Sequence, residues 1–113
     1  MGKWKKSSPE LVEKFAASME EFDVDHRKMF GYPCCFLNGN MLTGLHEENW
    51  VLRLSESDRK ELKESHDAQI FAPMKGRVMK EYLILPPAIL NSAELLATWI
   101  KRSISFVESL PGK

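Results

Sequence analysis

The fold of this chain is decided by residues 27–54, RKMFGYPCCFLNGNMLTGLHEENWVLRL. Near the middle of this stretch, the pair Asn38-Gly39 stands between two apolar runs. Asn-Gly favours a two-residue type I′ turn, because both central positions of that turn require a positive φ angle. The stretch therefore predicts three consecutive antiparallel strands. The first two pair around Asn38-Gly39, and the third runs from Trp50 to Leu54.

Pairing around this turn predicts which side chains share a face of the sheet, because side chains alternate along a strand. The face covered by helices is expected to hold Tyr32, Cys34, Phe36, Met41, Thr43, Leu45, Trp50, Leu52 and Leu54. The other face, which we expect to be partly solvated, takes Cys35, Leu42, His46, Val51 and Arg53. Both sets depend on a tight connection at Glu48-Asn49 with Leu45 opposite Leu52. One residue added to this connection would turn the Trp50–Leu54 side chains to the opposite face, unless a bulge compensated.

Helix signals stand on both sides of this stretch. Ser8-Pro9-Glu10 offers an N-cap, a proline at the first helical position and an early acid, so we expect a helix from there to about Glu21. A short, mostly exposed helix is expected from Asp58 to His66. The longest and most apolar helix is expected from about Ser92 to Ser109, and it should supply the main cover for the sheet.

Two further strands are expected after the second helix. Residues Ala68 to Phe71 form a short strand, and Val78 to Leu85 alternates with apolar residues on both faces, which is typical of a strand inside a sheet. The element order is then α-β-β-β-α-β-β-α. This order predicts the α+β class: a single antiparallel sheet with the first and last helices packed on one face.

Composition limits the function classes. A chain of 113 residues predicts one domain, residues 1–113, in which residues 1–7 form a flexible tail. The formal net charge is zero, which argues against a dominant attraction to nucleic acid or to an acidic membrane. No apolar run approaches the roughly 20 residues of a membrane-spanning helix, so we expect no membrane partner.

The two cysteines, Cys34 and Cys35, are adjacent. In a strand they point to opposite faces, so a disulfide between them would require gross distortion of the backbone. Free thiols in a reducing cytoplasm are the simpler interpretation. The polar, basic start of the chain has no apolar core of a signal peptide, so we expect a cytoplasmic protein.

Enzyme motifs are mostly absent. The sequence has no glycine-rich phosphate loop, HExxH, GxSxG or paired CxxC. Two aspartates and a histidine in residues 23–26 lack a fourth metal ligand, and turn capping is favoured for them. A cysteine nucleophile would need His26 or His46 beside Cys34 or Cys35, and the expected register keeps His46 several pairs from Cys35. We expect no catalytic residue, no cofactor and no metal.

A basic cluster is the one candidate site. Arg27 and Lys28 enter the first strand, and Lys75, Arg77 and Lys80 surround a later turn. If these two segments approach each other, they form a local anion or nucleic-acid site despite the zero net charge. Solvated charges at strand ends are the simpler interpretation.

Several motifs together resemble the N-terminal domain of the TfoX family, named for a bacterial competence regulator. They are RKMFG at 27–31, FLNGNM at 36–41, LRL at 52–54, MKEY at 79–82 before two prolines, and LLATW at 95–99. The resemblance covers residues 11–110. The chain departs from the family pattern after Gly31, where Tyr32-Pro33-Cys34-Cys35 replaces a second glycine and a Tyr-Gly pair.

The resemblance implies an α+β fold of the type-III-secretion-chaperone-like class and no assigned reaction. We expect a stand-alone domain that lacks the C-terminal domain of the competence regulators, so regulation of competence genes is not carried over. The leading hypothesis is a non-enzymatic, cytoplasmic regulatory or protein-interaction module whose partner is another protein or a second copy. One alternative is a nucleic-acid-binding accessory domain that uses the basic cluster. Another is a small-molecule or anion-binding protein with a pocket near Cys34 and Trp50.

Overall fold

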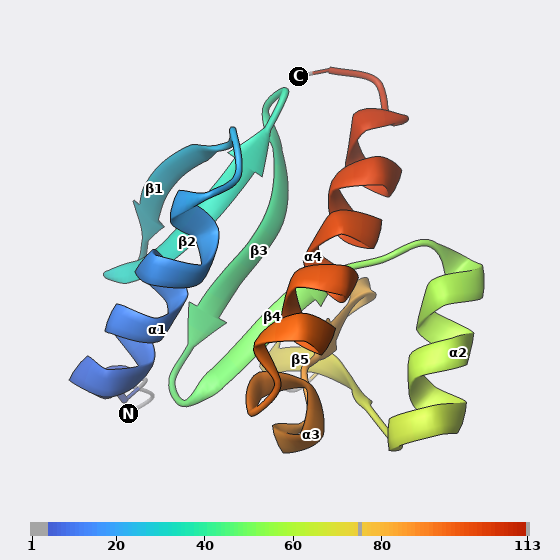
Figure 1. The fold of residues 1–113 in the computed structure, drawn as a ribbon, viewed down its shortest axis with the longest axis horizontal. Coiled ribbons are helices and arrows are strands. Elements are labelled where there is room, and N and C mark those ends of the chain that lie inside the picture. Colours follow the sequence, from blue (N-terminus) through green and yellow to red (C-terminus); the bar gives the residue numbers. More distant parts are fainter. Residues whose placement is uncertain (1–4, 75, 113) are drawn as a thin grey trace.

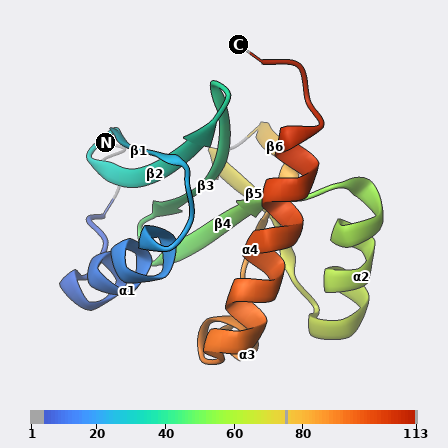
Figure 2. The same ribbon diagram turned by 45° about the horizontal axis from the view of Figure 1, so that its top comes forward.

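The structure, a computed structural model, describes residues 5–74 and 76–112. In chain order the elements are α1 (Pro9–Glu20), β1 (Asp25–Met29), β2 (Tyr32–Leu37), β3 (Asn40–His46), β4 (Asn49–Arg53), α2 (Glu56–His66), β5 (Gln69–Met74), β6 (Arg77–Ile84), α3 (Pro87–Leu90) and α4 (Ala93–Glu108). Within the described residues, the strands form one antiparallel sheet of six strands in the order β1-β2-β3-β4-β6-β5 (Figure 1). Helices α1 and α4 cover the same face of it (Figure 2). The predicted α+β class, with one antiparallel sheet and these helices on one face, is confirmed.

The segment before Asn38 forms two strands where the sequence predicts one. The chain turns back at Phe30-Gly31, where the φ angles are 55° and 84°. An aromatic residue disfavours a positive φ, which explains why sequence patterns miss this turn. The short helix α3 was also not predicted. Its Pro87 takes an early helical position directly after β6, where the fixed φ of proline suits a first turn.

The central hairpin turns at Asn38-Gly39, where φ is 53° and 81°. These two positive angles confirm the predicted turn. Phe36 lies opposite Met41, as predicted. The pair does not face the helices, however, because the register changes at the next residue.

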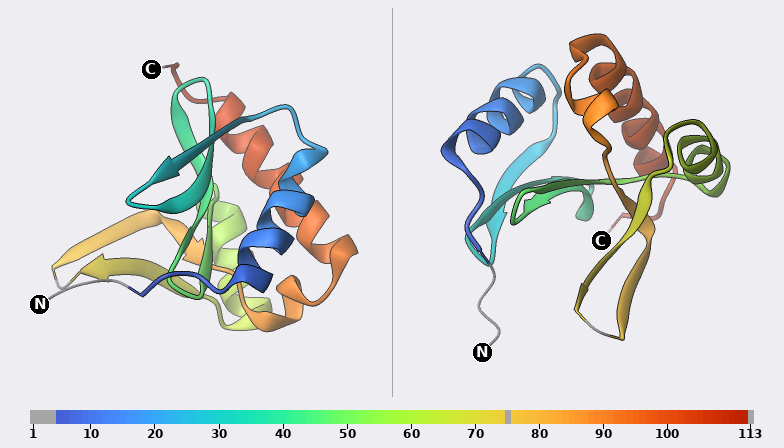
Figure 3. Two further views of the ribbon diagram at one scale, coloured as in Figure 1. Left: turned by 90° about the vertical axis from the view of Figure 1, so that its left-hand side faces the viewer. Right: turned by 90° about the horizontal axis from the view of Figure 1, so that it is seen from below.

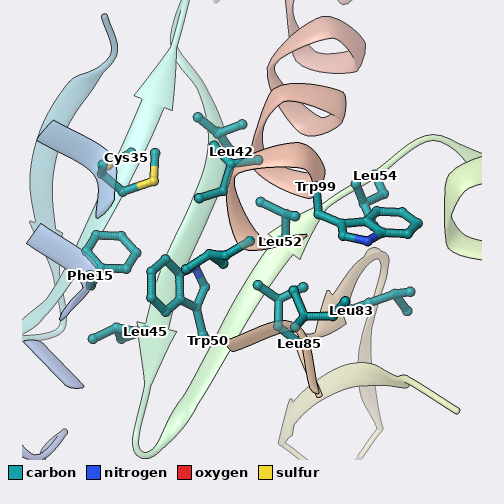
Figure 4. Close-up of a cluster of buried hydrophobic side chains, with 14 of the residues drawn as sticks. Phe15, Cys35, Leu42, Leu45, Trp50, Leu52, Leu54, Leu83, Leu85 and Trp99 are labelled. Atoms are coloured by element: carbon teal, nitrogen blue, oxygen red, sulfur yellow. The ribbon is translucent and has the colours of Figure 1, made fainter. Parts of the chain in front are cut away.

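A bulge in β3 causes this change. Cys35, and not Cys34, lies opposite Thr43, so Leu42 is an extra residue between two paired positions. Leu42 joins Cys35 in the core beneath the helices (Figure 4). The predicted faces of Cys34, Cys35, Phe36, Met41 and Leu42 are therefore wrong. The predicted faces of His46, Val51 and Arg53, and of Thr43, Leu45, Trp50 and Leu52, agree with the observed register.

The turn between β3 and β4 falls at Glu47-Glu48, one residue earlier than predicted. Leu45 consequently lies opposite Trp50 and not Leu52. Because the two partners differ by two residues, all three side chains still share the covered face. The indole Nε1 of Trp50 confirms this arrangement by donating a hydrogen bond of 2.9 Å to Thr43 Oγ1.

The main core lies between the sheet and the helices (Figure 4). Trp50 is fully buried and its ring centroid is 4.9 Å from that of Phe15 on α1. Helix α4 contributes Trp99, and its Ser103 hydroxyl donates a 2.6 Å hydrogen bond to the carbonyl oxygen of Arg53. Burying each large apolar side chain of this kind stabilises the fold by roughly 1.5–3 kcal/mol.

The prediction that the Val78–Leu85 strand lies inside the sheet is confirmed, because β6 pairs with both β4 and β5. The β5–β6 hairpin then leaves the plane of the sheet (Figure 3). Ile70 lies opposite Leu83, but the next residue, Phe71, lies opposite Met79. Skipping three residues of β6 at this point bends the hairpin away from the helices.

Residues 5–7, which belong to the predicted flexible tail, make hydrogen bonds to the turn between β3 and β4. The backbone N–H of Lys5 donates to Glu47 Oε2 at 3.0 Å, and the Ser7 hydroxyl donates to the Glu47 carbonyl oxygen at 2.5 Å. Tyr32 Oη also donates to the carbonyl oxygen of Lys5. The segment is thus tied to the β3–β4 turn before α1 begins. Residues 1–4 lie outside the described part.

Candidate functional site

The structure separates the two halves of the predicted basic cluster. Arg27 and Lys28 lie on β1 at one edge of the sheet, and Lys80 lies on β6 with β2, β3 and β4 between them. Lys75 lies outside the described residues, and only the backbone of Arg77 is described. The described basic side chains therefore do not come together through neighbouring strands.

One of the cysteine–histidine pairs considered from the sequence, His26 with Cys35, does come together. His26 lies opposite Cys35, and its Nδ1 is 3.8 Å from the Cys35 sulfur. The sulfur is fully buried, and this burial, together with the neighbouring Cys34, raises the pKa of the Cys35 thiol to about 12. A cysteine nucleophile reacts as the thiolate. This thiol stays protonated at neutral pH, so the pair is a weak hydrogen bond and not an activated dyad.

The face of the sheet turned away from α1 and α4, here called the open face, carries a continuous band of side chains from β1 to β6. The band consists of Arg27, Phe36, Met41, Arg53, Met79 and Tyr82. Each member contacts the next one across the sheet. The Arg27 guanidinium lies 4.8 Å from the centroid of the Phe36 ring, and Phe36 is the cross-strand partner of Met41.

The second half of the band continues from Met41 toward β6. The Tyr82 hydroxyl donates a hydrogen bond of 2.8 Å to the carbonyl oxygen of Met41. The guanidinium of Arg53 lies 5.6 Å from the centroid of the Tyr82 ring. Cation–π contacts of this kind contribute about 0.5–1 kcal/mol each at exposed sites. Arg27 therefore stands at the β1 end of the band, and a second arginine, Arg53, lies on β4 beside Tyr82.

A small second core includes three members of the band, Met41, Met79 and Tyr82. Val51, Phe71 and Tyr82 are buried against one another, and Met41, Met79 and Ile84 pack on them while keeping part of their surface exposed. The bent β5–β6 hairpin makes this core possible, because it carries Phe71 back toward the centre of the open face. These members of the band are therefore held in place by packing against buried side chains.

The two arginines differ in how their charge is satisfied. Arg53 is only 18% exposed, and its Nε and Nη2 both lie within 2.7 Å of Glu81 Oε1. Arg27 is 54% exposed, and its nearest carboxylate oxygen, on Asp25, is 3.7 Å away. Arg27 is therefore the band's accessible cation. Burial also raises the pKa of Tyr82, so its hydroxyl remains a hydrogen-bond donor.

Gly44 lies on the open face between Cys34 and Val51. A Cβ atom at this position would be 2.9 Å from Met41 Cε and 3.0 Å from Cys34 Cβ. The absence of a side chain therefore lets Met41 lie flat across the sheet. The Met41 side chain on β3 thereby connects the band members on β2 with those on β4.

His46 is a buried residue on the open face, beside the band. Its ring centroid lies 5.4 Å from that of Tyr32 and 5.2 Å from that of Phe71. Burial between these rings lowers the pKa of His46, because a charged imidazolium is poorly solvated there. At neutral pH the ring is therefore uncharged.

A cavity of about 190 Å³ lies elsewhere, between α1 and α4. Its lining consists of Ala17, Ser18, Glu21, Ala93, Leu96, Ala97 and Ile100. The predicted pocket near Cys34 and Trp50 is a different place, and both of those side chains are buried. The cavity therefore does not correspond to the predicted pocket.

Sequence reasoning found part of the open face and missed the band. Arg27 was singled out for its charge, and Arg53 was assigned to this face. Phe36 and Met41 were placed on the wrong face because the bulge was not recognised. The available signal was the adjacent pair Met41-Leu42, which breaks the alternation of apolar and polar residues.

Comparisons with known proteins give one match. The family model described as TfoX N-terminal domain matches residues 13–107. Neither the curated proteins nor the solved structures gave a match. Over the described part of the chain, no helix is both long and apolar enough to cross a membrane. Over the same part, no three His, Cys, Asp or Glu side chains are grouped as metal ligands would be.

Proposed function

This chain belongs to the TfoX N-terminal domain family, and we propose that it is a cytoplasmic regulatory module that binds another protein through the open-face band. In this proposal the chain catalyses no reaction. The partner's surface docks against the sheet, and the helices on the other side hold the sheet rigid. The domain would act by occupying its partner.

The composition and continuity of the band carry this proposal. Arginine, methionine and aromatic residues are the types enriched in protein interfaces, whereas lysine and glutamate are depleted there. Methionine adapts its shape to a partner, and tyrosine and arginine dominate binding energy at interface centres. The band combines these types on one face, with each member held by a neighbour.

Two further observations support a non-catalytic, cytoplasmic protein. The Cys35 thiol next to His26 has a pKa raised to about 12, which is the opposite of what a nucleophile requires. Both cysteines are free and buried, which suits a reducing compartment. Nucleic-acid binding is the weaker alternative, because the basic residues of β1 and β6 lie on either side of three other strands.

Affinity capture with matched variants tests the proposal. Phe36→Ala and Met79→Ala each remove an anchor from the band, while Leu95→Ala removes a side chain of similar size from the exposed part of α4, where Leu95 is 37% exposed. Circular dichroism melting first shows that the variants are folded. Co-purified proteins from the native host are then quantified by mass spectrometry against wild-type bait.

We expect at least one protein whose recovery falls roughly tenfold with both band variants and is unchanged with Leu95→Ala. That loss corresponds to about 1.4 kcal/mol of binding free energy. The same protein, once purified, should bind the wild type with the same dependence on the two side chains. If recovery of every co-purified protein is equal for the three variants, the band is not a docking surface. Binding to DNA or RNA at roughly 50 mM salt would instead favour the alternative.

A further inference from the structure

Strand β1 presents an unpaired edge in the described structure. It is the first strand of the sheet order, with β2 on one side (Figure 1). The β1–β2 hairpin closes with the two-residue turn Phe30-Gly31, so Met29 and Tyr32 are a hydrogen-bonded pair. Because such pairs alternate, Arg27 and Asp25 also direct their backbone groups toward β2. The N–H and C=O groups of His26 and Lys28 therefore point outward.

The side chains of this edge carry opposite charges on one face. Asp25 and Arg27 are two residues apart, so both lie on the open face, and their side chains are 64% and 54% exposed. Their mutual ion pair is long, at 3.7 Å between Arg27 Nη2 and Asp25 Oδ2. An edge strand is often protected by charged side chains, lysine in particular, that hinder pairing with another strand. This edge carries both signs and does not repel itself.

An antiparallel copy of β1 has three registers in which outward backbone groups meet outward backbone groups. With the two-fold axis at Arg27, that arginine faces its own copy. With the axis at Lys28, that lysine faces its own copy. With the axis at His26, each Asp25 faces the Arg27 of the other chain, and this happens twice in a symmetric pair. Opposite charges directly across a strand pair are favourable and like charges are not.

We propose that two copies of this chain associate through β1, antiparallel and with the two-fold axis at His26. The two sheets then join edge to edge into one continuous sheet. The carboxylate of each Asp25 and the guanidinium of each opposing Arg27 form the two ion pairs across the joint. Since Arg27 is also the end of the open-face band, the bands of the two chains become neighbours. The inference rests on the edge of the sheet and holds whether or not the band binds a partner.

Charge reversal tests both the contact and its register. Sedimentation equilibrium of the purified full chain measures the self-association constant for the wild type, Asp25→Arg, Arg27→Asp and the double variant. Each single reversal places like charges across the joint twice, and we expect association at least roughly tenfold weaker. The double variant restores opposite charges and should associate as the wild type does. Lys101→Asp changes the net charge by the same amount as Arg27→Asp, on the exposed face of α4, and should have no effect.

Mixing the two single variants gives a control that is independent of folding. When the Asp25→Arg chain meets the Arg27→Asp chain, both ion pairs become attractive, so the mixture should form heterodimers although each chain alone associates weakly. A wild type that stays monomeric at millimolar concentration overturns the proposal. So does a dimer that tolerates both single reversals, or one that the double variant fails to restore. A monomer whose β1 pairs instead with an extended segment of another protein also overturns it.

Discussion

The hydroxyl of Tyr82 on β6 donates a hydrogen bond to the carbonyl oxygen of Met41 on β3, across a distance of 2.8 Å, although β4 lies between these strands. The Tyr82 side chain therefore reaches across β4 on the open face. It joins the central hairpin to the second half of the sheet. The same bond places the Tyr82 ring between Met41 and the guanidinium of Arg53.

Removal of this hydroxyl should destabilise the fold. In Tyr82→Phe, the ring stays in place but the carbonyl oxygen of Met41 loses its donor from β6. Because a hydrogen bond of this kind contributes about 1 kcal/mol net, we expect the free energy of unfolding in urea to fall by about that amount. Tyr82 is buried, so water cannot readily replace the donor. Equal unfolding free energies for the two proteins would show that the bond contributes nothing to stability.

Gly44→Ala should cost stability through Met41. The new Cβ would meet Met41 Cε at 2.9 Å and Cys34 Cβ at 3.0 Å, so the flexible methionine has to move and β2 has to shift slightly. Overpacking of this kind costs about 1–3 kcal/mol. If Met41 is first replaced by alanine, the steric conflict with its Cε is gone. Gly44→Ala should then lower the free energy of unfolding by less in the Met41→Ala background than in the wild type. A double variant whose loss is the sum of the two single losses would contradict the contact.

Stability should fall as the pH is lowered below about 6.5, the ordinary pKa of histidine. Burial lowers the pKa of His46 in the folded chain, so the unfolded chain takes up a proton first. The contribution of His46 to the free energy of unfolding is therefore fully present above pH 6.5. It is lost as the pH falls from there toward the lower pKa of His46 in the folded chain. His46→Phe keeps an aromatic ring beside Tyr32 and Phe71 without the titrating group. The difference in unfolding free energy between wild type and variant should change with pH in this window only. A constant difference from pH 7.5 to pH 5 would sink this assignment.

The Cys35 thiol should be inert in the folded chain. With a pKa of about 12, about one molecule in ten thousand carries the thiolate at pH 8. In a Cys34→Ala background, Ellman's reagent should therefore not label the native protein within minutes, and it should label one thiol at once in guanidinium. Rapid labelling of the native protein would contradict both the burial and the raised pKa.

The turn and capping signals predicted much of the fold, because they act over a few residues. Ser8 caps its helix as expected, and Ser55 and Ser92 cap α2 and α4 in the same way, each accepting a hydrogen bond from a backbone N–H three residues on. The Asn38-Gly39 turn also depends only on its own two φ angles. Local chemistry of this kind can be read from the sequence.

The candidate site depended on information that no local pattern contains. The bulge at Leu42 lies where β3 meets Ser103 of α4, and it moves Phe36 and Met41 to the open face. The strand order cannot be read from a local pattern either. Strand β6 lies between β4 and β5, so Lys80 is separated from Arg27 by three strands. The basic cluster was inferred from charge alone, and the strand order places its described members Arg27 and Lys80 on strands that are not neighbours.

The bend in the β5–β6 hairpin bears on how this protein avoids fibre formation. An open sheet with two straight, accessible edges can add copies at both ends without limit. Here the register jump at Phe71 turns β5, the edge strand opposite β1, away from the plane of the sheet (Figure 3). A copy that pairs with β1 would therefore meet no second straight edge to continue from. In the proposed dimer both β1 edges are used, and the bend leaves no straight edge on β5 to which a third chain could add.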